Sequence, residues 1–249
     1  MTIFTAELKY FLRSPLIWLV AALFAFISAW SFLMAIELFI TMQINYAGMS
    51  NPPTIAQGII FPVIATVAKL SLLIVAIIAG LSFSRYSQNN AWSMVNAYCK
   101  NDFIFVWYKF LACFLICLLF IAPSLFAVFV LSILAQISLS SVLLSSMGML
   151  LLLMWMISLV LFLSSLSHNS GFAILLSLIV LVLLWSLSTG SLDASWGKNW
   201  LQTFSPQYHF HQFMSSSISF ASVFYFVSGI VLFLFATKQR LAHKRMILS

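Results

Sequence analysis

Glu37 and Lys69 are the two charged residues that lie inside long apolar runs of this chain, where a charge has chemical consequences. At 1.5 Å per helical residue, Glu37 lies about 5 Å and Lys69 about 14 Å from the nearer end of its run. An unpaired charge near the centre of a bilayer costs on the order of 3 kcal/mol. Lys69 therefore needs a partner or a wet cavity. Three interpretations stay open: a structural ion pair with Glu37, a cavity that contacts substrate, and an ion or proton path.

Other residues that could support catalysis or metal binding are isolated. His209 and His211 could bind a metal with help, but no carboxylate or cysteine clusters with them, so polar packing at an interface is the simpler interpretation. Leu192 stands where the first glycine of a phosphate-binding loop belongs, and no serine-hydrolase or zinc-protease motif occurs. Asp102 and Asp193 fall on opposite sides of the predicted membrane. We expect no enzyme activity, no cofactor and no metal in this chain itself.

The chain contains six long apolar runs, and Glu37 and Lys69 lie in the first and second of them. With 63% hydrophobic and 6% charged residues, the composition indicates an all-α integral membrane protein. About 20 apolar residues suffice to cross a bilayer. The sequence therefore predicts a single transmembrane domain over residues 1–249, with spans at 16–40, 60–83, 110–134, 142–163, 171–188 and 218–236.

The distribution of basic residues predicts the orientation. An even number of spans puts both termini on one side, and the positive-inside rule favours the cytoplasm. The net charge of +7 is spread over three segments that flank apolar runs, which fits membrane topology and a lipid bilayer partner better than nucleic acid. Nine of the eleven basic residues then lie inside, with only Lys69 within a span and Lys198 outside: Lys9, Arg13, Arg85, Lys100, Lys109, Lys238, Arg240, Lys244 and Arg245.

The segments outside the spans carry further predictions. Residues 5–15 suit an interfacial helix that ends where Pro15 turns the chain inward. Between spans two and three, residues 91–97 predict a short amphipathic helix, which either anchors the loop at the inner surface or docks a cytoplasmic partner. The outer segment 189–217 is rich in aromatic residues that we expect to dip into the outer interface, among them Trp196, Trp200, His209, Phe210 and Phe213.

Several short motifs occur in order along nearly the whole chain. They are Glu7-Leu8-Lys9 through Ser14-Pro15, Lys109-Phe110-Leu111, Ser205-Pro206-x-x-His209-Phe210-x-x-Phe213, and Tyr225-Phe226-x-Ser228. In these motifs the chain resembles ABC-2-type transporter permeases, and the gliding-motility and nitrous-oxide-reductase-maturation subgroup in particular.

This resemblance implies a permease that dimerises with a second copy or a paralogue and receives a separate cytoplasmic ATPase subunit, which holds the ATP and Mg²⁺. It implies a coupling helix between Arg85 and Asp102, where the family's usual acidic-basic cluster and Gly-Thr are replaced by residues 86–91, and an outer gate in the aromatic segment. The coupling residues would include Asn90, Ala91, Trp92, Val95 and Lys100. The resemblance also puts spans one and five at the dimer interface, and Ala21, Ala25 and Ala29 on one face of span one allow close helix approach.

The function that we expect is therefore the membrane-spanning half of an ATP-driven exporter in a bacterial inner membrane. An ion-coupled secondary transporter or channel that uses Glu37 and Lys69 is an alternative, although no inverted repeat supports it. A membrane scaffold of an envelope complex that transports nothing is a second alternative. An accompanying periplasmic protein would favour the motility-like subgroup.

Overall fold

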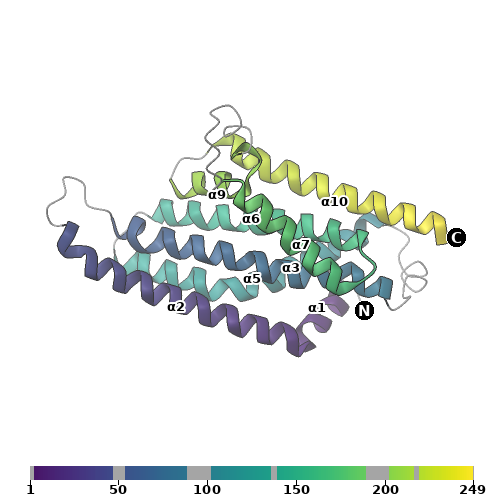
Figure 1. The fold of residues 1–249 in the computed structure, drawn as a ribbon, viewed down its shortest axis with the longest axis horizontal. Helices are drawn as coiled ribbons and strands as arrows, with labels where there is room; N and C mark the ends of the chain where they lie inside the picture. Colours follow the sequence, from purple (N-terminus) through teal and green to yellow (C-terminus); the bar gives the residue numbers. More distant parts are fainter. Residues whose placement is uncertain are drawn as a thin grey trace.

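The computed structural model describes residues 3–46, 54–88, 102–135, 139–188, 202–215 and 219–248. In these ranges all regular secondary structure is helical, which confirms the predicted all-α class (Figure 1). The elements are α1 (Ile3–Arg13), α2 (Pro15–Tyr46), a π-helical turn (Ala56–Ile60) that leads into α3 (Phe61–Gln88), α5 (Asp102–Leu134), α6 (Leu139–Leu166), α7 (Ser170–Ser186), α9 (Pro206–Met214) and α10 (Phe220–Leu248).

The break between α1 and α2 lies at Ser14, directly before Pro15. Proline is tolerated at the first position of a helix because its missing N–H would have no partner within the helix. The turn that the sequence predicted at Pro15 is therefore present. α1 buries Glu7 and Phe11, which are one helical turn apart, while Lys9 and Tyr10 on its other side are exposed.

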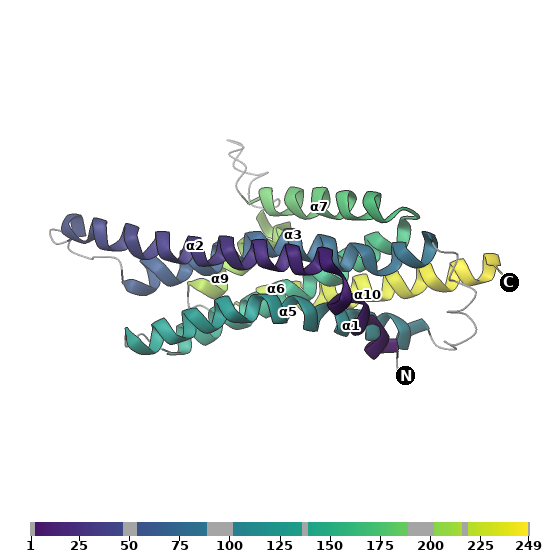
Figure 2. The ribbon, with the colours of Figure 1, turned by 90° about the horizontal axis from the view of Figure 1, so that it is seen from below.

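Helices α3 and α6 form the centre of the bundle. In each of them 67% of the most apolar window is buried within the chain, compared with 11% for α2. α3 packs against α2, α5, α6 and α7, and α6 packs in addition against α9 and α10. Figure 2 shows α2 and α7 toward one side of the bundle and α5 toward the other. The peripheral helices therefore present their remaining apolar surface outward, as expected for helices that face lipid.

Five helices are long and apolar enough to cross a membrane, namely α2, α3 with its preceding turn, α5, α6 and α10. The predicted fifth span over 171–188 corresponds to α7, which has 17 residues. Its length is about 26 Å, less than the ~30 Å of a hydrocarbon core. The five long helices extend beyond their predicted apolar runs at one end or both. α1 and the C-terminal end of α10 lie at the same end of the bundle (Figures 1 and 2).

The outer segment differs from the prediction of an aromatic loop. Its described part, residues 202–215, contains the helix α9, which begins with Pro206 at its first turn. Phe210 and Phe213 are buried against α6 and α10 and are not at a surface. This close packing requires Gly148 of α6, because a Cβ atom there would lie 2.7 Å from the Cβ of Phe213.

Candidate functional sites

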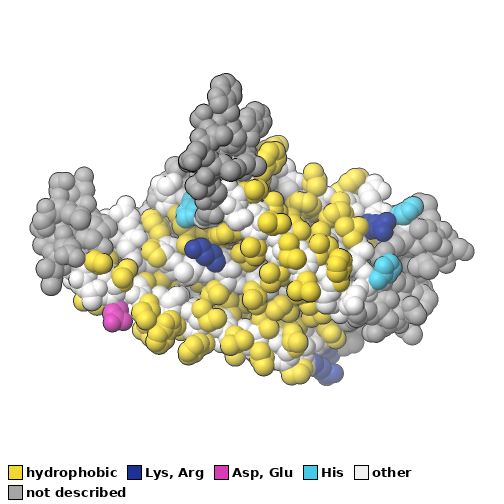
Figure 3. Space-filling model, viewed as in Figure 1, with side chains coloured by type: hydrophobic (Ala, Val, Ile, Leu, Met, Phe, Trp, Pro, Cys, Tyr) yellow, Lys and Arg dark blue, Asp and Glu magenta, His cyan; other side chains and the backbone are white. Residues whose placement is uncertain are grey.

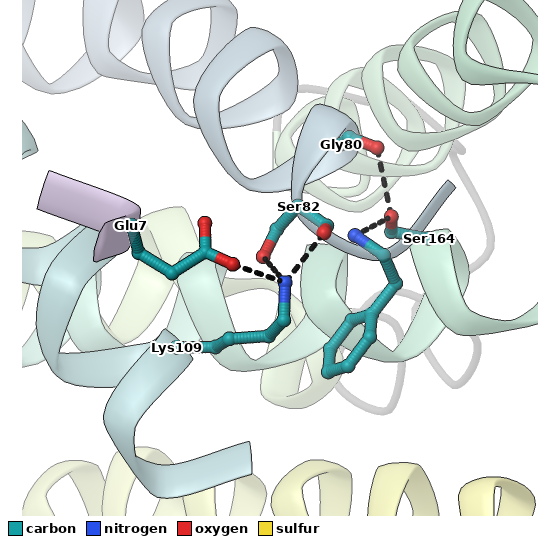
Figure 4. Close-up of polar contacts among 6 residues, drawn as sticks. Glu7, Gly80, Ser82, Lys109 and Ser164 are labelled. Atoms are coloured by element: carbon teal, nitrogen blue, oxygen red, sulfur yellow. Dashed lines mark hydrogen bonds and ion pairs between the residues drawn. The ribbon is translucent and has the colours of Figure 1, made fainter. Parts of the chain in front are cut away.

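A buried ion pair lies near the end of the bundle that contains α1. The Nζ of Lys109 lies 3.0 Å from a carboxylate oxygen of Glu7, and the two side chains are 0% and 1% exposed (Figure 4). Lys109 also donates to the backbone carbonyl of Ser82 at 2.6 Å and to the Ser82 hydroxyl at 3.2 Å. An ammonium group has three donors, and these three acceptors match them. These partners offset the cost of removing the ammonium group from water, which an unpaired buried ammonium group would bear in full.

Two aromatic rings and further hydrogen bonds surround this ion pair. The Nζ of Lys109 lies 4.7 Å from the ring centroid of Phe83 and 5.3 Å from that of Phe105, within the range of cation–π attraction. The hydroxyl of Ser164 donates to the carbonyl of Gly80 at 2.7 Å and accepts from the backbone N–H of Phe83 at 3.1 Å. The site therefore connects α1, α3, α5 and α6 through charged and polar contacts.

The location of the pair relates it to the predicted coupling segment. Ser82 lies in the last turns of α3, and Lys109 lies about 10 Å along α5 from its first residue, Asp102. The backbone of Arg85 lies in α3, between Ser82 and the segment. The remaining predicted coupling residues lie outside the described residues: Asn90, Ala91, Trp92, Val95 and Lys100. The pair thus joins the N-terminal helix to the two helices that lead into and out of this segment.

Sequence reasoning did not predict the Glu7–Lys109 pair. Lys109 counted there as one of nine inner basic residues and Glu7 as part of an interfacial helix, and each belonged to a short motif of the family resemblance, but neither was considered as a partner of the other. The available signal was that Lys109 borders a long apolar run while Glu7 is the single acidic residue before Glu37. Pairing them requires the fold, because they are far apart in sequence and belong to helices that are not consecutive.

Glu37 and Lys69 are not brought together. The Thr66 hydroxyl of α3 donates to the Ser31 hydroxyl of α2, and Phe39 of α2 lies against Gly58 just before α3. This antiparallel register places Glu37 level with Ile60, and the helical rise from Ile60 to Lys69 is about 14 Å. Both charged side chains are exposed, and in the described residues neither has an ion pair.

On the α9 side, His209 takes part in a buried polar cluster. Its Nε2 lies 2.8 Å from the carbonyl oxygen of Thr203 and its Nδ1 lies 2.9 Å from the hydroxyl of Ser222. Its ring stacks on Tyr225 with 4.2 Å between centroids. In the neutral ring with the proton on Nε2, Nε2–H donates to the Thr203 carbonyl, and the Ser222 hydroxyl, which lies next to Nδ1, donates its single hydrogen to the side-chain oxygen of Gln212. Ser222 is fully buried and unavailable to a substrate, so the pair fastens α9 to α10.

The imidazole pKa of His209 is lowered, chiefly by desolvation, with a smaller opposing effect from the hydrogen bond to Thr203. The pKa of His211 is also lowered, first by desolvation and then by the positive charge of Lys69. His211 therefore lies within electrostatic reach of Lys69. Trp196 and Trp200 lie outside the described residues.

The predicted dimer face lies along an apolar groove. Ala25 and Ala29 of α2 are exposed and line a groove of about 420 Å³ together with α5, whereas Ala21 is half-buried and packs on the core. A hydrogen bond of 3.2 Å between the Ser124 and Ser28 hydroxyls joins the two helices at the floor of the groove. Pro123 of α5 also lines it.

Comparisons with known proteins leave the family open. No protein-family model matches the chain, and no curated protein matches it either. Within the described ranges, no group of three or more histidine, cysteine or acidic side chains could hold a metal ion. The described residues thus form an apolar helical bundle that contains the buried Glu7–Lys109 ion pair and carries Lys69, which is exposed, at the middle of a long apolar helix.

Proposed function

We propose that this chain is the membrane-spanning permease subunit of an ATP-driven ABC exporter in a bacterial inner membrane, energised by a separate cytoplasmic ATPase subunit. The observation that carries the proposal is the buried Glu7–Lys109 pair, which ties α1 to α3 and α5, the helices on either side of the 89–101 segment. Force applied to that segment by a partner would reach α1 through a short, stiff set of contacts.

The proposal includes six spans, with α7 as the fifth, and both termini in the cytoplasm. The location of α1 and the C-terminal end of α10 at one end of the bundle supports an even number of crossings. A helix of about 26 Å can cross where flanking residues or local thinning of the bilayer accommodate the mismatch. The positive-inside rule then places the basic end of α10 inside.

In the proposed mechanism, ATP binding draws two ATPase subunits together, and each presses on the 89–101 segment of one permease copy. α3 and α5 move with the segment, and the ion pair carries α1 and then α2 along. Two bundles rocking about their interface would expose a path alternately to each side. All the energy comes from nucleotide binding and hydrolysis in the partner.

A pull-down of tagged protein from its native membrane tests the proposal. We expect recovery of a protein that binds ATP, identified by mass spectrometry, and its loss when Trp92 and Val95 are both changed to Asp. A matched control changes the outward-facing Phe172 and Leu175 of α7 to Ala, which should leave the partner bound. Absence of any ATP-binding partner from gentle preparations would contradict the proposal and favour the ion-coupled carrier or the scaffold.

A further inference from the structure

We propose that Lys69, together with a hollow between α3 and α9 whose lining ends one helical turn before it at Ala65, binds the anionic headgroup of a lipid-like amphiphile that enters from the bilayer. The inference names the substrate class of the proposed exporter and rests on that function for its role in transport. The binding itself needs neither ATP nor a partner subunit.

Lys69 supplies the unsatisfied charge. It lies at the middle of the 28-residue span Ala56–Phe83, and the middle of a ~30 Å hydrocarbon core is about 15 Å from either interface, too far for a lysine side chain to reach. Its side chain is exposed, and no ion pair or hydrogen bond joins it to any residue that the structure describes. A cation at this depth is costly without a counter-charge. An anion bound beside it would remove that cost.

The hollow has the size and position to bring an anion to Lys69. Its volume is about 460 Å³, and it is lined by Ala65 of α3 and by His211 of α9 among others. Lys69 follows Ala65 by one helical turn and so lies on the same face of α3. The pKa of His211 is lowered first by desolvation and second by the positive charge of Lys69, which is consistent with the location of Lys69 one turn beyond the lining of the hollow.

The polar groups around the hollow favour a negative ligand. Gln57 lines one wall and can donate from its amide, and His211 can donate from its ring. The amide Nε2 of Gln207, in the preceding turn of α9, lies 3.4 Å from the Nε2 of His211 and can donate to it, which leaves Nδ1–H of the neutral ring as the donor to a ligand. None of the described residues that line the hollow is acidic. Charge complementarity therefore selects a phosphate or carboxylate group.

The surroundings favour an amphiphile over a free anion. Leu73, one turn beyond Lys69, is 49% exposed, and Phe61, Pro62 and Met214 add apolar walls. Figure 3 shows a largely apolar face, on which a basic side chain and a histidine side chain lie near each other left of centre. A soluble anion would cross apolar surface without compensation, whereas a lipid brings acyl chains that match it.

The test measures binding of fluorescent phosphatidic acid to the purified full-length protein by anisotropy, with fluorescent phosphatidylcholine as the neutral comparison. We expect Lys69→Met to weaken phosphatidic acid binding about tenfold or more, as expected for loss of a charge-assisted contact. Lys69→Arg should retain most of the affinity, and phosphatidylcholine binding should not change. Lys9→Met, which removes an exposed charge on α1, is the matched control and should bind like the wild type.

Two results would overturn the inference. One is unchanged phosphatidic acid binding in Lys69→Met, and the other is displacement of the lipid by equimolar inorganic phosphate, which would indicate a site for soluble anions. If Lys69→Met cannot be purified in folded form, His211→Gln must show a selective loss for phosphatidic acid, or the inference fails. Absence of an ATPase partner in the pull-down would reject the exporter and leave this binding result unaffected, so the two failures are distinguishable.

Discussion

At the scale of single residues, the Glu7–Lys109 pair is the contact whose loss has the largest expected consequence. Lys109→Met would leave the Glu7 carboxylate buried without its cation, and we expect the free energy of unfolding to fall by about 3–5 kcal/mol. The double variant Glu7→Gln with Lys109→Met should recover much of that loss, because both partners are then uncharged. Unfolding by SDS in mixed micelles is measured for the wild type, the single variants Glu7→Gln and Lys109→Met, and the double variant.

The control for this cycle is Lys9→Met, because Lys9 is exposed on the same helix as Glu7. It should change the free energy of unfolding by less than about 0.5 kcal/mol. Additive effects of the two single substitutions at positions 7 and 109 would show that the side chains do not act as a pair.

His209 predicts a dependence of stability on pH. Burial lowers its folded-state pKa below the ordinary value of 6.5, so the folded protein binds a proton less readily than the unfolded chain. Its stabilising effect is therefore fully present above about pH 6.5 and is lost as the pH falls from there toward the folded-state pKa. We expect the melting temperature to fall between pH 7 and pH 5, and His209→Gln to flatten that slope.

His211 contributes in the same direction, since its pKa is lowered as well. His209→Gln and His211→Gln should each remove part of the slope, and the double variant should remove more than either. A slope identical in the wild type and the double variant would mean that other groups cause it. Replacing Lys69 by Met should raise the pKa of His211, which NMR of labelled histidine can follow.

At the scale of elements, the position of α9 depends on a single glycine. In Gly148→Leu the new side chain would overlap Phe213, whose own Cβ cannot move without its backbone. We expect a loss of about 1–3 kcal/mol from overpacking and a displacement of α9. Hydrogen exchange should rise in residues 206–214 and stay unchanged in the centre of α3. Met147→Leu, at a position 61% exposed, is the matched control; equal exchange in both variants would contradict the packing.

The helices show which elements can be predicted from local sequence patterns. Long apolar runs predicted every long helix, because length and hydropathy are properties of the segment alone. The short α9 was missed, because its apolar residues are interspersed with glutamine and histidine. It is packed against α6 and α10 by contacts that no local pattern reports, such as that of Phe213 with Gly148.

At the scale of the whole molecule, the proposed topology makes a direct prediction. A green fluorescent protein fused after Ser249 should fluoresce, because it would stay in the cytoplasm, and alkaline phosphatase fused after Lys198 should be active, because it would be exported. Green fluorescent protein fused after Lys198 should not fluoresce, and alkaline phosphatase fused after Ser249 should be inactive. An active alkaline phosphatase at the C-terminus would contradict both the even number of spans and the proposed orientation.

The amino-acid sequence by itself determined that the chain is helical and apolar enough for a membrane and where its long helices run, because these depend on composition along short segments. Only the tertiary structure decided which charges meet. Glu7 and Lys109 pair across the bundle, while Glu37 and Lys69, which were candidate partners because they are the two charges inside apolar runs, are separated by about 14 Å along the helix axis. The physical reason is that helix register and packing are fixed by close contacts such as Phe39 with Gly58, whose partners lie in different segments of the sequence.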